Sequence, residues 1–309
     1  MSKYRLVTRS DFDGLVCAAL LKELDIIDKI LFVHPKDMQD GKIKINSNDI
    51  ITNLPYVEGC YLTFDHHESE IIRNKDKKFE NYIIDPYSPS AARLVYNYYG
   101  GESNFPNISK DMMEAVDKAD FAQFTIDDVL MPKGWELLSF IMDSRTGLGR
   151  FKEFRISNYQ LMMNLIDACR KMTIDDILNL PDVKERVEIY FEYQDLAEEQ
   201  IKRCSQIVSN IVILDLREEE IIYPTNRFTI YGLYPQCNVS IHRMWGLDKK
   251  VNVFAVGKSI FNRTCESDIG LLMLKYGGGG HSSAGTCQIG NEKSDEILNE
   301  IINQLLQYN

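Results

Sequence analysis

Short apolar runs alternate with helix-like stretches over the first 125 residues of this 309-residue chain. Five runs are predicted strands and two stretches are predicted helices: 4–8, 29–33, 50–52, 61–64 and 82–84, and 15–24 and 90–98. Strands that alternate with helices form parallel sheets with helices on both faces. In such sheets, ligands bind beyond the carboxyl ends of the strands. The N-terminal part is therefore predicted to be α/β, with a site at that edge.

Three parts are predicted along the chain: an N-terminal domain with a helical extension at 1–185, a connector helix at 186–210 and a smaller mixed α/β domain at 211–309. The middle region is mostly helical in pattern, and one long helix, with Pro181 near its start, is predicted over 183–207. After it, the predicted strands are 211–214, 228–233, 239–241 and 251–256, and the predicted helices are 267–276 and 293–306.

Composition restricts the compartment and the partners. Seven cysteines are scattered without C-x-x-C spacing, so they are predicted to be reduced and mostly buried thiols. No run reaches the roughly 20 apolar residues that span a bilayer, and no signal peptide is seen. We therefore expect a cytoplasmic protein without a membrane partner. The net charge of −11 argues against coating long duplex nucleic acid, but not against gripping a few phosphates. The composition does not decide between a monomer and a homodimer.

Two aspartates follow the first predicted strand in the segment Ser10-Asp11-Phe12-Asp13-Gly14. Acidic side chains one residue apart can reach one point where the chain turns off a strand end. Gly14 lets the backbone come close, and the next helix N-terminus favours negative charge. The alternative is that these side chains simply cap the helix.

The string Asp65-His66-His67 follows another predicted strand. Carboxylate oxygen together with imidazole nitrogen suits manganese, zinc or iron. Adjacent rings do not easily bind the same ion, so one is expected to bind metal and the other to meet substrate or a supporting carboxylate. The alternative is a pair of solvated loop histidines. Asp120 lies at the end of a predicted helix, and without further evidence an aspartate there is expected to be a solvated surface charge.

Four glycines precede a histidine and two serines in the string 277–283. Glycines expose backbone N–H groups and permit positive φ, so such a string can form an anion cradle. His281 and the serine hydroxyls add donors suited to phosphate. The alternative is a flexible turn.

Taken in order, these strings resemble the DHH phosphoesterase family with its DHH-associated C-terminal domain, in the exopolyphosphatase-like and nanoRNase-like branch. The matching segments are 10–14, 65–67 and 278–281, and 89–95 resembles the helix after the central motif. The resemblance implies an N-terminal parallel-sheet domain with helices on both faces, a helical connector and a smaller mixed C-terminal domain.

The resemblance also implies roles for individual residues. Asp11 and Asp13 would each bind one metal, His66 would bind the second, and Asp65 would orient or join the cluster. The family's last acidic motif resembles Asp-x-x-x-Phe, which Asp120 fits better than Asp117 does. His67 would contact the phosphate or the leaving group. In the C-terminal domain, the implied substrate-binding residues are Arg263, Gly278, Gly279, Gly280, His281 and Ser282.

Two positions depart from the family pattern. Arg9 stands where many relatives have histidine, and Asn53 stands where a bridging aspartate is usual. An amide oxygen can bind a metal but brings no charge, so one of two metal sites would be weak. Arg9 could instead take over part of the phosphate neutralisation.

The resulting expectation is a divalent-metal phosphoesterase that cuts short oligonucleotides or dinucleotides, with water activated by the bound cation. Manganese is the first choice because of the mixed ligands, and magnesium or another divalent ion remains an alternative. Tyr276, Phe261 or Trp245 could stack a base, although core packing is the plainer interpretation. Two alternatives stay open: a polyphosphatase or other phosphoanhydride hydrolase, and a non-catalytic nucleotide-binding protein.

Overall fold

The computed structural model describes residues 3–67, 70–71, 74 and 79–307. The chain forms two compact units. The first unit comprises 1–123, 132–144 and 149–188, and the second comprises 124–131, 145–148 and 189–309. The change from one unit to the other at 188/189 falls within helix α10 (Pro181–Cys204). The predicted division at 185 and 210 stays a prediction.

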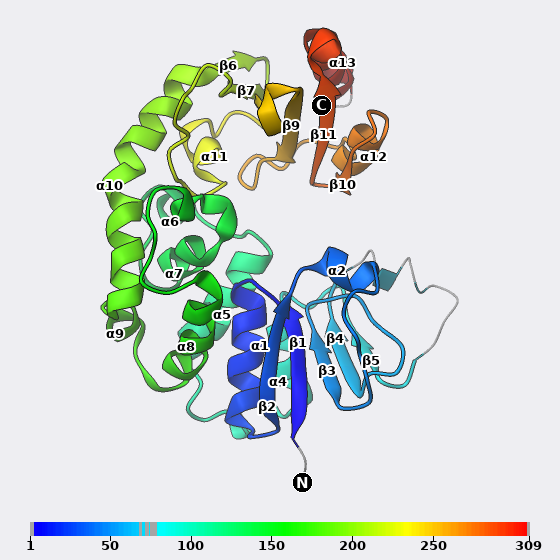
Figure 1. The fold of residues 1–309 in the computed structure, drawn as a ribbon, viewed down its shortest axis with the longest axis vertical. Helices are drawn as coiled ribbons and strands as arrows, with labels where there is room; N and C mark the ends of the chain where they lie inside the picture. The colour runs from blue at the N-terminus through cyan, green and yellow to red at the C-terminus, as the bar shows by residue number, and fades with distance from the viewer. Residues whose placement is uncertain (1–2, 68–69, 72–73, 75–78, 308–309) are drawn as a thin grey trace. The chain divides into compact units, whose positions relative to one another are not determined.

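The first unit is built on five parallel strands in the order β2-β1-β3-β4-β5 (Figure 1). These are β1 (Tyr4–Arg9), β2 (Ile27–Val33), β3 (Asp49–Thr52), β4 (Leu62–Asp65) and β5 (Tyr82–Ile84). β3 and β4 are buried along their whole length, as expected of strands covered on both faces. The strand order reverses between β1 and β3, and open α/β sheets bind ligands beyond the carboxyl ends at such a point.

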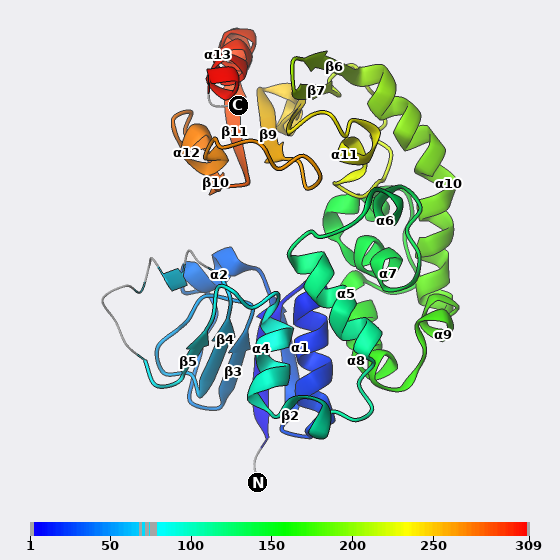
Figure 2. The same cartoon turned by 180° about the vertical axis from the view of Figure 1, so that it is seen from behind.

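Helices cover one face of this sheet in two layers. Figure 2 shows α1 and α4 along the sheet, and α5 and α8 pack against α1 from the other side. The helices of the unit are α1 (Phe12–Glu23), α2 (Pro35–Gln39), α4 (Ala91–Tyr98), α5 (Lys110–Asp120), α7 (Gly134–Met142), α8 (Asn158–Lys171) and α9 (Ile174–Leu178). Because α1 lies between the sheet and these helices, it is apolar on nearly every side and most of its residues are buried.

The opposite face is covered more thinly. Val7 and Ile51 pack there with Met38 of α2 and with Leu54 and Cys60 of the following loops. The predicted parallel sheet with helices on both faces is therefore confirmed, and among the described residues the short helix α2 contributes to this second side.

The second unit contains a six-stranded mixed sheet in the order β10-β11-β9-β8-β7-β6. Its strands are β6 (Ser205–Val208), β7 (Ile211–Asp215), β8 (Val239–Trp245), β9 (Val251–Lys258), β10 (Gly279–His281) and β11 (Ala284–Gly290). Its helices are α6 (Ile126–Leu130), α11 (Thr229–Leu233), α12 (Ile269–Leu274) and α13 (Ser294–Gln307). α12 and α13 bury one face of the sheet in a core that includes Ile241, Phe254, Ile269 and Ile301.

Two sequence predictions for this unit are wrong. The strand predicted at 228–233 is helix α11, which follows a turn in which the Asn226 side chain accepts a hydrogen bond from the Phe228 N–H. The long helix predicted to residue 207 ends at Cys204, because Ser205–Val208 pairs with β7 as strand β6. Strands β10 and β11 were not predicted at all.

Within the described ranges, none of the helices has the length and apolar character that crossing a bilayer requires. All seven cysteines are free thiols, and six of them are buried, as predicted.

Candidate active site

The turn between β1 and α1 uses its aspartates in two different ways. Asp11 caps α1, accepting a hydrogen bond from the Gly14 N–H at 2.9 Å. A side chain at Gly14 would lie 2.0 Å from the Arg9 carbonyl oxygen, so the close approach requires glycine. The capping alternative thus holds for Asp11. Asp13 enters the first turn of the helix and points elsewhere.

Asp13 is held by the N-terminus of α4. Its carboxylate accepts hydrogen bonds from the Ala91 N–H at 3.0 Å and the Ala92 N–H at 2.7 Å. The side chain is almost completely buried. Burial, followed by the charge of Asp120, raises the pKa of Asp13 to about 7, against the opposing effect of His66. A buried carboxylate beside a second acid is a strong position for a cation.

His66 lies between the two acids. Its Nε2 atom is 3.0 Å from an Asp120 oxygen and 3.9 Å from an Asp13 oxygen, and Nδ1 is 3.3 Å from the Ser88 carbonyl oxygen. Burial lowers the pKa of His66, but the contact with Asp120 and the charge of Asp13 outweigh it and raise the pKa to about 9. Burial would raise the pKa of Asp120, and His66 instead lowers it.

The donor atoms of Asp13, His66 and Asp120 all lie within 4.8 Å of one another. We call these three side chains the metal-ligand group. The His66 Nε2 atom is buried and, although it lies 3.0 Å from an Asp120 oxygen, the two groups are not aligned for a hydrogen bond, and no other group of the described chain supplies one. Such an atom calls for another partner. One imidazole nitrogen and two carboxylate oxygens fit a divalent transition metal.

Asp65 supports its neighbours instead of facing this group. Its carboxylate accepts hydrogen bonds from the His66 N–H at 2.8 Å, the His67 N–H at 3.2 Å and the Tyr82 hydroxyl at 3.1 Å. His67 Nδ1 lies 2.7 Å from the same carboxylate. Burial lowers the pKa of His67, but the bond to Asp65 outweighs it and the pKa is raised. The contact fixes the His67 ring with its Nε2 edge free to point away from Asp65.

A second polar group surrounds Asp11. Asn53 donates from Nδ2 to both Asp11 oxygens, at 3.1 and 3.3 Å, and Arg9 Nε lies 2.9 Å from the same carboxylate. Asn53 has a φ of 55°, in the left-handed region that asparagine and aspartate tolerate better than most residues. Its Oδ1 atom is buried and has no hydrogen-bond partner in the described chain. In this arrangement Asp11 is paired with the Arg9 guanidinium at 2.9 Å, whereas the nearest basic group of the described chain to Asp13 is the His66 ring, at 3.9 Å.

The glycine string of the second unit was expected to be an anion-binding loop, but part of it forms a strand. Gly279–His281 is strand β10, paired antiparallel with Ala284–Thr286. A side chain at Gly278 would lie 2.0 Å from the Thr286 carbonyl oxygen, so this glycine allows close strand packing. The flexible-turn alternative is wrong for Gly279–His281, which form a strand. At Gly278, glycine is required because a larger side chain would clash with the paired strand. His281 and Ser282 are exposed beside it.

The other predicted substrate contacts also lie in the second unit. Arg263 donates from Nε to the Ile260 carbonyl oxygen at 3.0 Å, within the loop after β9. This loop neighbours the glycine string, because the Lys258 N–H, at the end of β9, donates to the Ser283 carbonyl oxygen at 2.9 Å. Binding of substrate by Arg263, Gly278, Gly279, Gly280, His281 and Ser282 stays a prediction.

Two of the three candidate stacking aromatics have structural partners. The hydroxyl of Tyr276 donates to Glu300, and its ring packs against the core of the second unit. Trp245 donates from its indole N–H to the Arg217 carbonyl oxygen, and the Arg217 guanidinium lies over its ring. Core packing is therefore the better interpretation for Tyr276, while Trp245 is held by a hydrogen bond and a cation–π contact.

Several site residues escaped the sequence analysis. The backbone N–H groups of Ala91 and Ala92 hold Asp13, but a backbone donor has no signature in the sequence. Asp117, set aside in favour of Asp120, binds Ser90 at 2.7 Å and Arg93 at 2.8 Å. The capping pattern that begins at Ser90 is the signal that could have drawn attention to this region.

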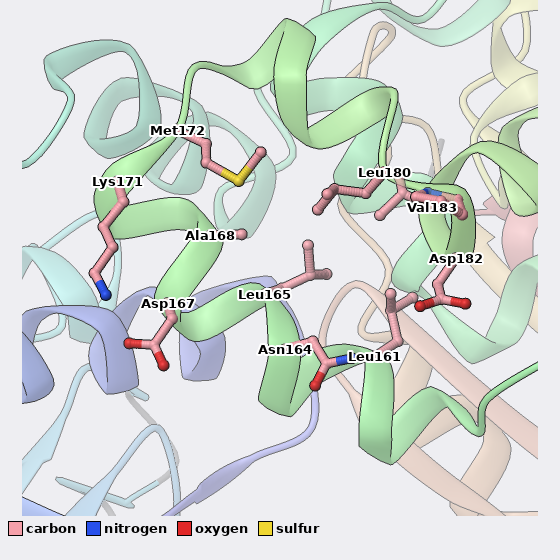
Figure 3. Close-up of a pocket in the computed structure, with 11 residues that line it drawn as sticks. Leu161, Asn164, Leu165, Asp167, Ala168, Lys171, Met172, Leu180, Asp182 and Val183 are labelled. Atoms are coloured by element: carbon pink, nitrogen blue, oxygen red, sulfur yellow. The ribbon is translucent and has the colours of Figure 1, made fainter.

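A hollow of about 370 Å³ lies elsewhere in the first unit, between α8 and the start of α10. Figure 3 shows residues that line it. Apolar side chains such as Leu161, Leu165 and Val183 make up much of its lining. It contains no histidine and none of the predicted catalytic residues. We therefore place the chemistry at the strand ends.

Comparison with known proteins identifies the family to which the chain belongs. No family model and no curated protein matches the chain. Among solved structures, the pGpG-specific phosphodiesterase PggH from Vibrio cholerae is 59% identical, covers 99% of this chain and 100% of its own length, and has a TM-score of 0.90. The DHH domain of a member of a ribosomal protein family is 12% identical, with 99% and 87% coverage and a TM-score of 0.59. This chain belongs to the DHH phosphoesterase family.

A more distant structural likeness is to CDC45 from Entamoeba histolytica, at 9% identity, 98% and 95% coverage and a TM-score of 0.54. Both distant likenesses concern the fold alone. The predicted DHH family and α/β fold class are confirmed, as is the predicted hydrolase acting on phosphodiester bonds. The non-catalytic alternative is not supported.

Proposed function

We propose that this DHH phosphoesterase hydrolyses pGpG, a guanine dinucleotide, and that manganese is its metal. The observation that carries the catalytic part is the metal-ligand group at the reversal of strand order, where one imidazole and two carboxylates meet around a buried, unbonded nitrogen. The proposed substrate is inferred from PggH, a pGpG-specific phosphodiesterase that is similar to this protein along the whole chain. The mixed oxygen and nitrogen donors favour manganese over magnesium.

Each residue of the first unit has a proposed task. Asp13, His66 and Asp120 would hold one cation, which when bound supplies an acidified water and neutralises phosphoryl charge. Asp11 and Asn53 would hold a second, weaker cation, because Arg9 already balances Asp11. Asp65 would not bind metal in this proposal, since its oxygens are taken by His66, His67 and Tyr82.

His67 would contact the substrate. Asp65 holds its Nδ1 side at 2.7 Å, and the side chain is 31% exposed, so the Nε2 edge is free to donate a hydrogen bond to a phosphoryl or leaving oxygen. Arg9, at the end of β1, would add positive charge for the phosphate. In the second unit, His281, Ser282, Arg263 and the glycines Gly278, Gly279 and Gly280 would bind the non-scissile part of the dinucleotide.

The net charge of −11 supports a short substrate over long duplex nucleic acid, and we keep the cytoplasm as the proposed compartment. A homodimer remains an open proposal.

The test is a substrate panel with purified protein and manganese. It contains pGpG, pApA, a five-nucleotide RNA, adenosine bisphosphate and polyphosphate, and product is measured by chromatography. We expect pGpG to be cut at least tenfold more efficiently than the other compounds. Equal turnover of the RNA would contradict dinucleotide selectivity. Turnover of polyphosphate alone would favour the phosphoanhydride alternative.

A further inference from the structure

We propose that Asp117 is a positioning residue that sets the separation of Asp13 and Asp120, and thereby the affinity of the metal-ligand group for its cation. The inference rests on the proposed function, because it assumes that this group binds metal. Asp117 itself touches neither Asp13 nor His66 in any contact of the described chain. It acts through the two helices that carry them.

The Asp117 carboxylate makes a dense set of contacts with α4. One oxygen accepts from the Ser90 hydroxyl at 2.7 Å, and the other accepts from Arg93 Nε at 2.8 Å and Arg93 Nη2 at 2.5 Å. The Asp117 side chain is 17% exposed and that of Arg93 is 24% exposed. A forked contact between guanidinium and carboxylate is among the strongest and most directional of side-chain interactions.

On the α4 side, the contact ends at the residues that hold Asp13. Ser90 is the N-cap of α4 and accepts a hydrogen bond from the Arg93 N–H at 3.0 Å. The next two residues, Ala91 and Ala92, donate their N–H groups to the Asp13 carboxylate. A displacement of Ser90 therefore moves both donors to Asp13.

On the α5 side, Asp117 lies three residues before Asp120, the last residue of the helix. Residues three apart lie on the same side of a helix. The Phe121 N–H also donates to the Asp117 carbonyl oxygen at 3.2 Å, so the turn that carries Asp120 closes on Asp117. One carboxylate thus ties the two donor-bearing segments together.

An ion pair between helices could simply stabilise the fold, and α5 offers a matched pair for that comparison. Lys118, the next residue, lies 2.8 Å from Glu136 of α7, and the two side chains are 28% and 20% exposed. This pair has similar burial and also joins α5 to another helix. Its acceptor carboxylate belongs to α7, not to α4.

The experiment compares Asp117→Ala, Asp117→Asn and Glu136→Gln with the wild-type chain. Manganese binding is measured by calorimetry, pGpG hydrolysis by kcat and KM, and stability by thermal melting of the metal-free protein. We expect Asp117→Ala to weaken manganese binding at least tenfold and to lower kcat, with KM within twofold. Asp117→Asn keeps an acceptor for Ser90 and should recover part of the lost affinity. Glu136→Gln should lower the melting temperature without changing manganese affinity.

The inference is overturned if Asp117→Ala binds manganese as the wild type does, or if Glu136→Gln weakens binding equally. Should Asp117→Ala fail to fold, Asp117→Asn and Arg93→Gln decide the question by the same measurements, since both loosen the contact. A wild-type protein that binds no manganese would instead contradict the proposed function, so the two failures are distinguishable.

Discussion

The strand ends of the first unit and the glycine string of the second unit both look like functional motifs, but they are built on different physical grounds. At the strand ends, polar atoms from α1, α4, α5 and the segment after β4 converge, and the buried Nε2 atom of His66 has no aligned hydrogen-bond partner in the described chain. In the glycine string, backbone atoms crowd together, and Gly278 leaves no room for a side chain beside Thr286. The residues of the first motif are required for their polar atoms and charges, and those of the second largely because larger side chains would clash with the backbone.

This difference teaches that a motif can be specific for two separate reasons. Substitutions at the strand ends should change chemistry while leaving the fold intact. Substitutions at the crowded glycine should first change the fold of the second unit, and activity only as a consequence. Each expectation below tests one side of this contrast.

The largest effect is expected from Asp120→Asn. The change removes one carboxylate from the metal-ligand group, and kcat for pGpG should fall at least about 10³-fold, or about 4 kcal/mol in barrier height. The metal-free protein should melt at a slightly lower temperature, because the loss of the His66–Asp120 ion pair outweighs the relief of repulsion between Asp120 and buried Asp13. Glu114→Gln, an exposed change on the same helix, is the control and should leave both quantities unaltered. A large loss of stability in Asp120→Asn would make this residue structural.

Next in size is the contrast between two neighbouring glycines. Gly278→Ala forces a methyl group to within 2.0 Å of a backbone oxygen, whereas a side chain at Gly279 would meet nothing within 4 Å. We expect Gly278→Ala to lower the free energy of unfolding by about 2 to 3 kcal/mol and Gly279→Ala by less than about 0.5 kcal/mol. Denaturant unfolding measures both. Equal tolerance of the two changes would show that the string is a flexible cradle after all.

A smaller effect is expected from Asn53→Asp, which returns the charge that the family usually has there. Without metal, the new carboxylate loses the hydrogen bonds to Asp11 and faces its charge, so stability should fall by about 1 to 2 kcal/mol. The backbone should be unaffected, because aspartate also tolerates the left-handed φ of 55°. With manganese, calorimetry should detect tighter binding of a second ion. A variant that binds no more manganese than the wild type would contradict the proposed weak second site.

The sequence predicted the first unit better than the second for a physical reason. The buried runs around Val7 and Ile51 mark parallel strands, and the carboxyl ends of such strands meet at one edge, so Asp11, Asp13 and His66 could be placed near one another. The supporting atoms could not be predicted, because the N–H groups of Ala91 and Ala92 are donors that every chain has. Their use depends on where α4 lies in three dimensions.

In the second unit, strand β10 could not be predicted because its formation depends on pairing with another strand. Glycines in strand β10 carry no apolar alternation, so nothing in Gly277–Gly280 indicates a strand until its partner β11 is known. Asp120 was predicted from its resemblance to a family pattern. Asp117 was not, because its contacts with Ser90 and Arg93 are visible only in the structure.

The smallest effect concerns the aromatic side chains of the two units. In the second unit, Tyr276 and Trp245 are held by structural contacts, whereas Tyr87 in the first is 91% exposed, and its ring contacts no other aromatic ring of the described residues. Its backbone N–H is held by Asp85 at 2.9 Å, and the next residue, Ser88, places its carbonyl oxygen beside His66. An exposed ring on a held loop next to the metal-ligand group is well placed to stack a base.

We expect Tyr87→Ala to raise KM for pGpG about fivefold, or about 1 kcal/mol, at the low end of stacking energies because one face of the ring stays in water. Tyr87→Phe keeps the ring and should behave as the wild type. The measurement is steady-state hydrolysis of pGpG by the three proteins at saturating manganese. An unchanged KM in Tyr87→Ala would mean that no base rests on this ring. A loss in Tyr87→Phe as well would assign the effect to the hydroxyl group. Stacking is supported only if the two variants separate, because only then does the flat apolar ring, rather than its polar tip, account for the binding.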